Sequence, residues 1–387
     1  MIEHAPDGSL RLPALATAHS HAFQRAMRGQ AQRPAPVAPG SAAGDDFWSW
    51  RAHMYALAGS LTPESIHAIS LVAYRELASA GVRTVGEFHY VHHQQGGEPY
   101  DDRTVLADAV IDAAKQAGLR VCLLRVAYHR AGPGRPAEPG QRRFCDPVVD
   151  DVLRDVDTLR ARWARDPHVR IGIAPHSVRA VPPSWLAAIR DHALRHELAV
   201  HMHVAEQLRE VDECLAETKR RPVELLADHG LLSRRFVAVH ATHLRPHEAR
   251  LLGDAGAFAC ICPSTERDLG DGLPDIGALR AAGVRLCTGI DSHVLTDPIE
   301  ELRALETLER LRTMRRATFR PASGTPAAQL WREGSLEGAA ACGFDDAGGH
   351  TLLRRDHPSL ALVPDDARLD AVVFGSGASV IAGVCPA

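Results

Sequence analysis

Five short segments of the chain end an apolar run with residues that bind metals or exchange protons. They are His19-Ser-His21, His176, His203-Val-Ala-Glu206, His240 and Asp291-Ser-His293. Histidine nitrogens and carboxylate oxygens are common ligands of zinc, and a catalytic zinc site collects them from separate parts of a chain. The pattern therefore predicts a metal-dependent site that is assembled from several strands.

A histidine pair such as His19 and His21 is weak evidence alone, because such pairs in loops are often only solvated polar residues. The later segments strengthen the case, since each follows a strand-like apolar stretch. These stretches are residues 169–174, 198–202, 236–239 and 284–289. Side chains at the ends of several strands can all point into one cavity, as at the mouth of a parallel barrel.

Strand-like and helix-like stretches alternate along much of the chain. The expected strands are residues 82–88, 120–126, 169–174, 198–204, 236–240, 258–262 and 284–289, and the expected helices are 104–117, 183–196, 209–229, 246–255 and 276–282. This alternation predicts an α/β fold, a (β/α)8 TIM-like barrel of the metal-dependent hydrolase type. An open doubly wound sheet is the alternative, but it would need a Gly-x-Gly-x-x-Gly turn after its first strand, which this sequence lacks there.

Two stretches depart from the alternation. Residues 30–46 are rich in proline, glycine and alanine, which predicts a loop long enough to cover a pocket. Short apolar runs at 351–353, 360–363 and 369–374 predict strands of a small β appendage. The expected domains are a short N-terminal β segment (1–15), a catalytic barrel (16–345) and a C-terminal β segment (346–387).

The composition allows a large core and carries no strong charge. Of the 387 residues, 45% are hydrophobic and 24% charged, and the formal net charge is −4. We expect no nucleic-acid partner, because there is no basic field, and no membrane partner or secretory leader, because no segment has the necessary apolar length. A cytoplasmic location follows. Four cysteines in apolar runs should be buried core residues in a reducing compartment: Cys122, Cys260, Cys262 and Cys287.

Several motifs resemble those of the formimidoylglutamate deiminases of the amidohydrolase superfamily, over roughly residues 12–345. The motifs are His19-Ser-His-Ala-Phe-Gln-Arg-Ala-Met, Phe47-Trp-Ser-Trp-Arg, Glu87-Phe-His-Tyr-Val-His-His, Ala174-Pro-His-Ser-Val-Arg, His201-Met-His-Val-Ala-Glu-Gln, Val239-His-Ala-Thr-His and Gly289-Ile-Asp-Ser-His. His-x-His and the late aspartate occur throughout the superfamily, whereas the His-Ala-Phe-Gln-Arg and Phe-His-Tyr segments point to this family. The resemblance implies a barrel fold, zinc dependence and a role in histidine breakdown.

The metal ligands that the resemblance implies are His19, His21, His203 and Asp291. Residues i and i+2 of a strand share a face, so His19 and His21 can bind one ion together. By the same alternation His201 faces inward with His203, and we expect it to pack or hydrogen-bond behind the ligands. Binuclear relatives generally bridge two metals with a carboxylated strand lysine, but the only two lysines here lie in helix-like segments. One Zn²⁺ per chain is therefore expected.

Three residues are expected to carry the chemistry. Bound zinc lowers the pKa of water to about 7, and Asp291 is both a ligand and a proton acceptor for that water. Glu206 fits a general acid/base that protonates the departing nitrogen, and His240 fits a polarising group beside the reacting carbon. Each has a plainer reading, in which Glu206 caps a helix and His240 is a core histidine.

The resemblance also implies a set of groups that hold a small dicarboxylate substrate, namely Gln24, Arg51, Tyr90, His176 and Arg179. Arginine suits a carboxylate because its planar group donates two parallel hydrogen bonds, while the other three residue types supply single donors. The expected reaction is hydrolysis of N-formimidoyl-L-glutamate to N-formyl-L-glutamate and ammonia. The expected assembly is a homodimer.

Two other function classes stay open. A purine or pterin deaminase would need an aromatic stacking pocket, which 5% aromatic residues and arginines at the binding positions do not favour. A catalytically silent relative would have lost a ligand or the acid/base residue, and none is lost. One departure from the family is also clear: only 18 residues precede His19, so half of the usual β subdomain is expected to be missing and the strands at 351–373 to keep an unpaired edge.

Overall fold

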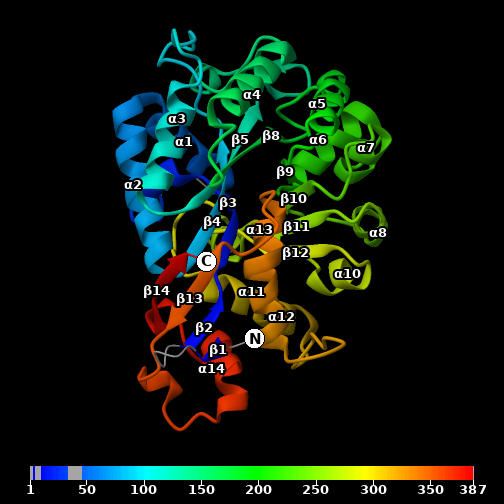
Figure 1. Ribbon diagram of the computed structural model, residues 1–387. Coiled ribbons are helices and arrows are strands. Elements are labelled where there is room, and N and C mark those ends of the chain that lie inside the picture. Colours follow the sequence, from blue (N-terminus) through cyan, green and yellow to red (C-terminus); the bar gives the residue numbers. More distant parts are fainter. Residues whose placement is uncertain (1–2, 5–9, 34–45, 387) are drawn as a thin grey trace, which may run out of the picture.

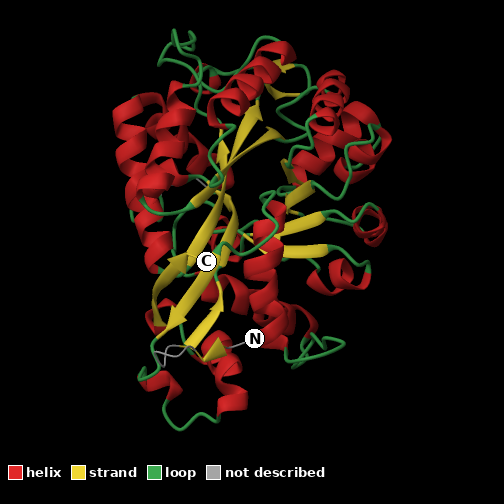
Figure 2. Ribbon diagram, in the orientation of Figure 1, coloured by secondary structure: helices red, strands yellow, loops and turns green. Residues whose placement is uncertain are grey.

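The computed structural model describes residues 3–4, 10–33 and 46–386, and its centre is a parallel β-barrel surrounded by helices (Figure 1, Figure 2). The strands follow the order β12-β11-β10-β9-β8-β5-β4-β3 in one eight-stranded sheet. They are β3 (Leu15–Ser20), β4 (Val82–His89), β5 (Arg120–Ala127), β8 (Val169–Pro175), β9 (Val200–Val204), β10 (Phe236–His240), β11 (Phe258–Ile261) and β12 (Arg285–Thr288). The predicted (β/α)8 fold is confirmed, whereas most of the predicted loop at 30–46 lies outside the described residues.

The barrel is closed between β3 and the segment that follows β12. A parallel bridge joins Ser20 to Asp291. The amide of His21 donates to the carbonyl oxygen of Asp291 at 2.9 Å, and the amide of Asp291 donates to the carbonyl oxygen of His19 at 3.0 Å. A Cβ at Gly289 would lie 2.8 Å from Cβ of His19, so this close approach requires glycine. Closure therefore brings the ligand-bearing ends of the first and last strands side by side.

Helices cover the outside of the barrel, mostly where the sequence predicts them. They are α1 (Phe47–Ser60), α2 (Pro63–Ser79), α3 (Val105–Gln116), α4 (Val149–Trp163), α5 (Pro183–Arg195), α6 (Leu208–Thr218), α7 (Pro222–Asp228), α8 (Pro246–Asp254), α9 (Pro263–Leu269), α10 (Ile276–Ala281), α11 (Pro298–Thr313), α12 (Pro326–Arg332), α13 (Gly338–Ala341) and α14 (Arg368–Gly375). The prediction of one helix at 209–229 is wrong, because Lys219 adopts a left-handed φ of 61° that ends α6, and Pro222 begins a separate helix.

A second, antiparallel sheet joins the two ends of the chain below the barrel, in the order β1-β2-β13-β14 (Figure 1). Its strands are β1 (Glu3–His4), β2 (Leu10–Pro13), β13 (Gly349–Leu353) and β14 (Ile381–Pro386). The expected unpaired edge at 351–353 is wrong, because β13 pairs with β2 on one side and β14 on the other. The small β appendage itself is confirmed.

Two of the three strands predicted for the C-terminal segment are also wrong. Residues 358–360 form a single 3-10 turn, and residues 368–375 form helix α14. The buried residues of α14 are Leu369, Val372 and Val373. Their spacing of three and four residues is the period of a helix face, whereas the apolar run at 369–374 alone does not distinguish a helix from a strand.

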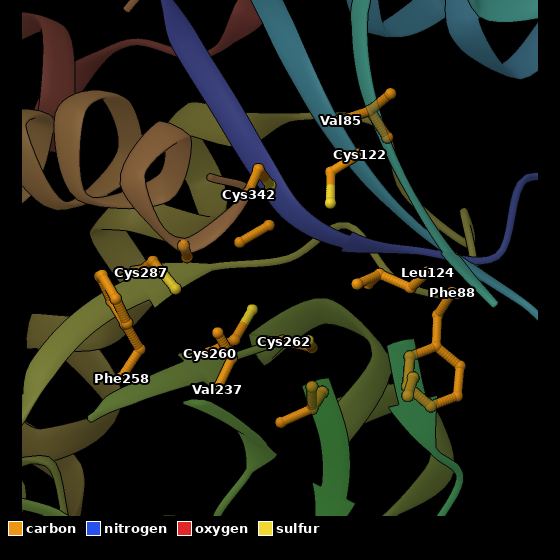
Figure 3. Close-up of a cluster of buried hydrophobic side chains, with 14 of the residues drawn as sticks. Val85, Phe88, Cys122, Leu124, Val237, Phe258, Cys260, Cys262, Cys287 and Cys342 are labelled. Atoms are coloured by element: carbon orange, nitrogen blue, oxygen red, sulfur yellow. The ribbon is translucent and has the colours of Figure 1, made fainter. Parts of the chain in front are cut away.

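The barrel interior away from its mouth is filled by apolar side chains and thiols. Figure 3 shows Cys122, Cys260, Cys262, Cys287 and Cys342 gathered there among valine, leucine and phenylalanine. These five cysteines are fully buried, and all eight cysteines of the chain are free thiols. The prediction that they are core residues is confirmed. None of the described helices is long and apolar enough to cross a membrane.

Candidate active site

Four side chains meet at the mouth of the barrel with the spacing of metal ligands. The Nε2 atom of His19 lies 3.2 Å from Nε2 of His21 and 3.2 Å from Nε2 of His203, and Oδ1 of Asp291 lies 3.5 Å from the first two nitrogens. Ligands about 2.0–2.1 Å from a tetrahedral zinc are separated by roughly 3.3–3.4 Å. The side chains of His19, His21, His203 and Asp291 are thus close enough together to hold a metal ion.

The backbone holds these ligands from behind. Nδ1 of His21 is hydrogen-bonded to the carbonyl oxygen of Phe88 at 3.0 Å, which leaves Nε2 facing the centre. The carboxylate of Glu87 accepts from the hydroxyl of Ser20 at 2.6 Å and from the amide of Ala22 at 2.8 Å, and so fixes the segment that carries both histidines. His201 instead bonds a backbone carbonyl oxygen below the site at 2.9 Å, as expected of a residue that is not a ligand.

Burial keeps the predicted ligand histidines neutral, which is the form that binds a metal. Burial lowers the pKa of His21 to about 3, and it lowers the pKa of His203 well below its ordinary value. The neighbouring imidazoles add to both shifts, because two cations would repel at this distance.

Backbone strain marks two of the expected catalytic residues. His240 has a φ of 68° and Asp291 a φ of 58°, both in the left-handed region that residues other than glycine seldom adopt. His240 is the last residue of β10, and Asp291 lies three residues after β12. Such strain persists only where the surrounding structure enforces it, and it clusters at functional sites.

His240 lies between three carboxylates. Its Nε2 is 3.5 Å from Oε1 of Glu206 and 3.7 Å from Oδ2 of Asp291, and its Nδ1 is 3.3 Å from Oε1 of Glu266. Burial alone would lower the pKa of His240, but the charge of Glu206, the hydrogen bond with Glu266 and the charge of Asp291 outweigh it and raise the pKa to about 10. Burial raises the pKa of Glu206. The pair can therefore hold a proton beside the metal centre.

A cavity opens above these groups. All five predicted substrate-binding residues line it: Gln24, Arg51, Tyr90, His176 and Arg179. Gln24 donates to the hydroxyl of Tyr90 at 2.8 Å, which orders one wall. The cavity thus contains both the expected metal centre and the expected binding groups.

The two arginines of this cavity, half-buried Arg51 and buried Arg179, have no acidic partner. Within the described residues, neither Arg51 nor Arg179 has a carboxylate within ion-pair distance, and Nη1 of Arg51 is a buried donor with no hydrogen-bond partner. The guanidinium of Arg179 donates only to the hydroxyl of Tyr128 and the carbonyl oxygen of Ala131, each at 3.3 Å. A pocket lined by two arginines that no carboxylate pairs with is suited to an anionic ligand.

Sequence reasoning missed much of the wall of this cavity. The residues it missed are Phe47, Trp50, Met54, Tyr55, Tyr128, Phe144, Thr265 and Leu269, together with Glu266 behind His240. A low aromatic content does not exclude an aromatic wall, because Phe47, Trp50, Tyr55, Tyr90, Tyr128 and Phe144 all line this cavity. The Phe47-Trp-Ser-Trp-Arg motif was the available signal, since three of its five residues line the cavity.

Known proteins agree with this geometry. The model of the amidohydrolase family matches residues 10–351. A formimidoylglutamate deiminase from Pseudomonas aeruginosa is 38% identical over 379 residues, which cover 96% of this chain and 82% of that protein. The crystal structure of an amidohydrolase from Brucella melitensis has a TM-score of 0.87 at 36% identity, over 97% of this chain and 82% of that one.

A more distant solved structure shares the fold. The structure of an adenosine deaminase from Xanthomonas campestris with bound zinc has a TM-score of 0.78 at 22% identity, over 98% of this chain and 79% of that one. With the strand-end ligand cluster and the cavity above it, these matches establish that the chain belongs to the amidohydrolase family and is a hydrolase that acts on carbon–nitrogen bonds.

Proposed function

We propose that this enzyme is a zinc-dependent deiminase that hydrolyses N-formimidoyl-L-glutamate to N-formyl-L-glutamate and ammonia in histidine degradation. The observation that carries the proposal is the pair of unpartnered arginines, Arg51 and Arg179, in the same cavity as the ligand cluster. A substrate with two carboxylates and one amidine carbon would satisfy both ends of that cavity. The 38% identity to a formimidoylglutamate deiminase supports the same substrate.

The chain's own residues would divide the work. Arg51 and Arg179 bind the carboxylates, and Gln24, Tyr90 and His176 supply further hydrogen bonds that orient the amidine. A bound zinc ion, held by the three histidines and Asp291, would supply a nucleophile at neutral pH. The metal-bound neighbour structure noted above supports zinc as that ion.

Proton transfer decides which nitrogen leaves. The reacting carbon carries a terminal nitrogen and the glutamate nitrogen, and the one that receives a proton departs. Glu206 follows the strand that carries His203, so it lies on the metal side of the cavity, while the arginines anchor the glutamate end. Glu206 would therefore protonate the terminal nitrogen, and the cationic His240 beside it would stabilise developing negative charge. Ammonia is the expected leaving group.

The proposal includes one zinc ion per chain, a cytoplasmic location and assembly as a homodimer. Metal analysis of the purified enzyme is expected to give about one zinc per chain, because the described ligand cluster has room for one tetrahedral ion. His203→Ala should lose both the metal and the activity, since three or fewer ligands hold zinc far more weakly. Full activity in a metal-free preparation would contradict this part of the proposal.

A second candidate is a deaminase of a planar heterocycle such as a purine. The aromatic wall of the cavity, with Trp50, Tyr55 and Phe144, is the observation that favours it. The two arginines disfavour it, because a neutral ring would leave both guanidinium groups without a counter-charge. An 8-oxoguanine deaminase from Pseudomonas aeruginosa is 30% identical over 307 residues, which makes this the activity to test beside the first.

The deciding experiment compares ammonia release from N-formimidoyl-L-glutamate and from a panel of aminopurines, with zinc removed and then restored. We expect zinc-dependent release from the first substrate only. NMR analysis of the products should show N-formyl-L-glutamate. Formamide and free glutamate would mean that Glu206 faces the other nitrogen, and release from a purine alone would replace the proposal with the second candidate.

A further inference from the structure

The tyrosine subsite, which we define as Tyr55, Tyr128 and Gln141, lies at the wall of the same cavity and has no role in the proposal above. We propose that it is a donor-only anion subsite, in which Gln141 is a positioning residue that turns both tyrosine hydroxyls toward a carboxylate of the ligand. The inference rests on the proposed function for the identity of the substrate, but not for the kind of ligand group that the subsite binds.

The hydrogen bonds of Gln141 fix its amide in one orientation. Gln141 ends the 3-10 turn Pro139–Gln141 and is fully buried. Its Oε1 accepts from the backbone amide of Glu138 at 2.8 Å, so the other end of the side chain must be the NH₂ group. That group donates to the hydroxyl of Tyr55 at 2.9 Å and to the hydroxyl of Tyr128 at 2.9 Å.

Both tyrosines are thereby made donors to the cavity. A phenol oxygen that accepts from Gln141 must direct its own hydrogen elsewhere, and no acceptor for either hydrogen is found in the described part of the chain. The hydroxyl of Tyr128 also accepts from Arg179 at 3.3 Å, which leaves it still less capacity to accept from a ligand. Tyr55 and Tyr128 both line the cavity. Their two hydrogens are the ones left for a bound molecule.

The charges around the subsite match an anion. The guanidinium of Arg51 lies over the ring of Tyr55 at 5.3 Å from its centroid, and Arg179 contacts Tyr128. Burial raises the pKa of Tyr55, so its hydroxyl stays protonated at neutral pH. The subsite offers two arginine cations and two tyrosine hydroxyls whose hydrogens have no acceptor among the described residues. This set suits a carboxylate, which only accepts hydrogen bonds. A ligand without acceptor oxygens would leave these donors unsatisfied, and a neutral amide would accept from them without balancing the charge of the two arginines.

Substitutions of Gln141 separate this role from simple packing. Gln141→Glu keeps the size of the side chain but reverses its hydrogen bonding, because a carboxylate accepts from the tyrosines and adds a negative charge beside the ligand. Gln141→Leu removes the two donated hydrogen bonds without adding charge. Gln116→Leu is the matched control, since Gln116 is an exposed glutamine that bonds only to His67 among the described residues.

The first measurement is calorimetric binding of glutarate, a plain dicarboxylate, and of glutaramide, its neutral counterpart, to the metal-loaded enzyme. We expect Gln141→Leu to weaken glutarate binding about 10-fold and Gln141→Glu to weaken it more, by the usual worth of a hydrogen bond to a charged group. Glutaramide binding should change little. Equal glutarate affinity in wild type and Gln141→Glu, or equal loss for both probes, would overturn the inference.

The second measurement is steady-state kinetics on N-formimidoyl-L-glutamate, in which KM should rise about 10-fold in Gln141→Leu while kcat changes less. Thermal unfolding identifies variants that fail to fold. If the Gln141 variants fail to fold, Tyr55→Phe and Tyr128→Phe, which each remove one hydroxyl oxygen, replace them. Both must then lose glutarate binding selectively, and unchanged glutarate binding refutes the subsite.

The two proposals fail in different ways. If wild type releases no ammonia but binds glutarate in a manner that depends on Gln141, the proposed function fails and the subsite stands. If wild type releases ammonia but its affinity for glutarate is independent of Gln141, the subsite fails and the proposed function stands.

Discussion

Two buried arginines, Arg125 and Arg179, differ in whether carboxylates surround them. Arg125 of β5 donates to Asp146 at 2.8 and 3.0 Å and to Asp155 at 2.6 Å, and all three side chains are almost fully buried. Arg179, which follows the neighbouring strand β8, is equally enclosed but contacts only neutral oxygens of Tyr128 and Ala131. The first arginine is neutralised within the protein, and the second is not.

The difference separates buried charges that stabilise the fold from those that are available to bind a ligand. Removing a charge from water is costly, and a fold repays that cost only with close partners of opposite charge. Arg125 has such partners, and Asp146 also accepts a third arginine hydrogen bond from Arg103 at 3.3 Å. Arg179 faces a cavity instead. We therefore expect substitutions around Arg125 to change stability and substitutions around the cavity to change catalysis.

The largest effect on catalysis should come from Glu206→Gln. The variant keeps the shape of the side chain but cannot exchange a proton, so kcat should fall by about 10²- to 10⁴-fold. Zinc content and thermal unfolding temperature should stay near those of wild type, because Glu206 faces the cavity and is not among the expected ligands. The exposed Glu197→Gln is the control and should keep full activity. A variant that loses its metal as well would assign Glu206 to the ligand set instead.

The largest effect on stability should come from Arg125→Met. It leaves Asp146 and Asp155 buried beside each other without their main cationic partner, and removal of one member of a buried pair costs about 3–5 kcal/mol. The free energy of unfolding, measured by chemical denaturation, should fall by that amount. A loss below about 1 kcal/mol would show that the network contributes no more than an exposed pair and would remove the contrast with Arg179.

Much of the fold could be predicted from the sequence, because local patterns determine it. The strand at 236–240 and the helix at 246–255 follow from apolar periodicity and a proline at the helix start, and the structure places both within one residue. The strand predicted at 369–374 failed because a short apolar run fits either period. Only packing in the folded chain selects the helix there.

The site was predictable to the extent that it lies at strand ends. His203 and His240 both occupy such positions in β9 and β10, so strand pairing alone brings them together. Gln141 and Tyr55 could not be found in this way. Tyr55 reaches the cavity from helix α1, Gln141 bonds it from a loop after β5, and no local pattern shows this hydrogen bond. Glu266, which bonds His240, lies in the unpredicted helix α9.

Arg179→Met gives the sharpest test of the contrast, because the same substitution is made at the other arginine. It should lower kcat/KM for the dicarboxylate by about 10- to 150-fold, or about 1.5–3 kcal/mol, through loss of hydrogen bonds to a carboxylate. The free energy of unfolding should stay within about 1 kcal/mol of wild type, because no carboxylate among the described residues is left unpaired. Equal destabilisation by Arg125→Met and Arg179→Met would refute the distinction.

The smallest effect is an acid-dependent loss of stability that belongs to the paired arginine alone. Burial would raise the pKa of Asp146, but the charge of Arg125 and the hydrogen bonds from His93 and Arg125 outweigh it and hold the pKa below its ordinary value of 3.8. The ionised carboxylate therefore stabilises the folded state above pH 3.8, and this contribution is lost as the pH falls through the lower folded pKa.

Asp146→Asn isolates that contribution from the other carboxylates of the protein. The variant should be less stable than wild type at neutral pH, and the difference in the free energy of unfolding should shrink as the pH is lowered below about 4, because wild type alone loses the ionised group. Denaturation curves at a series of pH values measure the difference directly. A difference that is constant over this range would mean that Asp146 is not ionised in the folded state. Asp146 would then not neutralise the charge of Arg125.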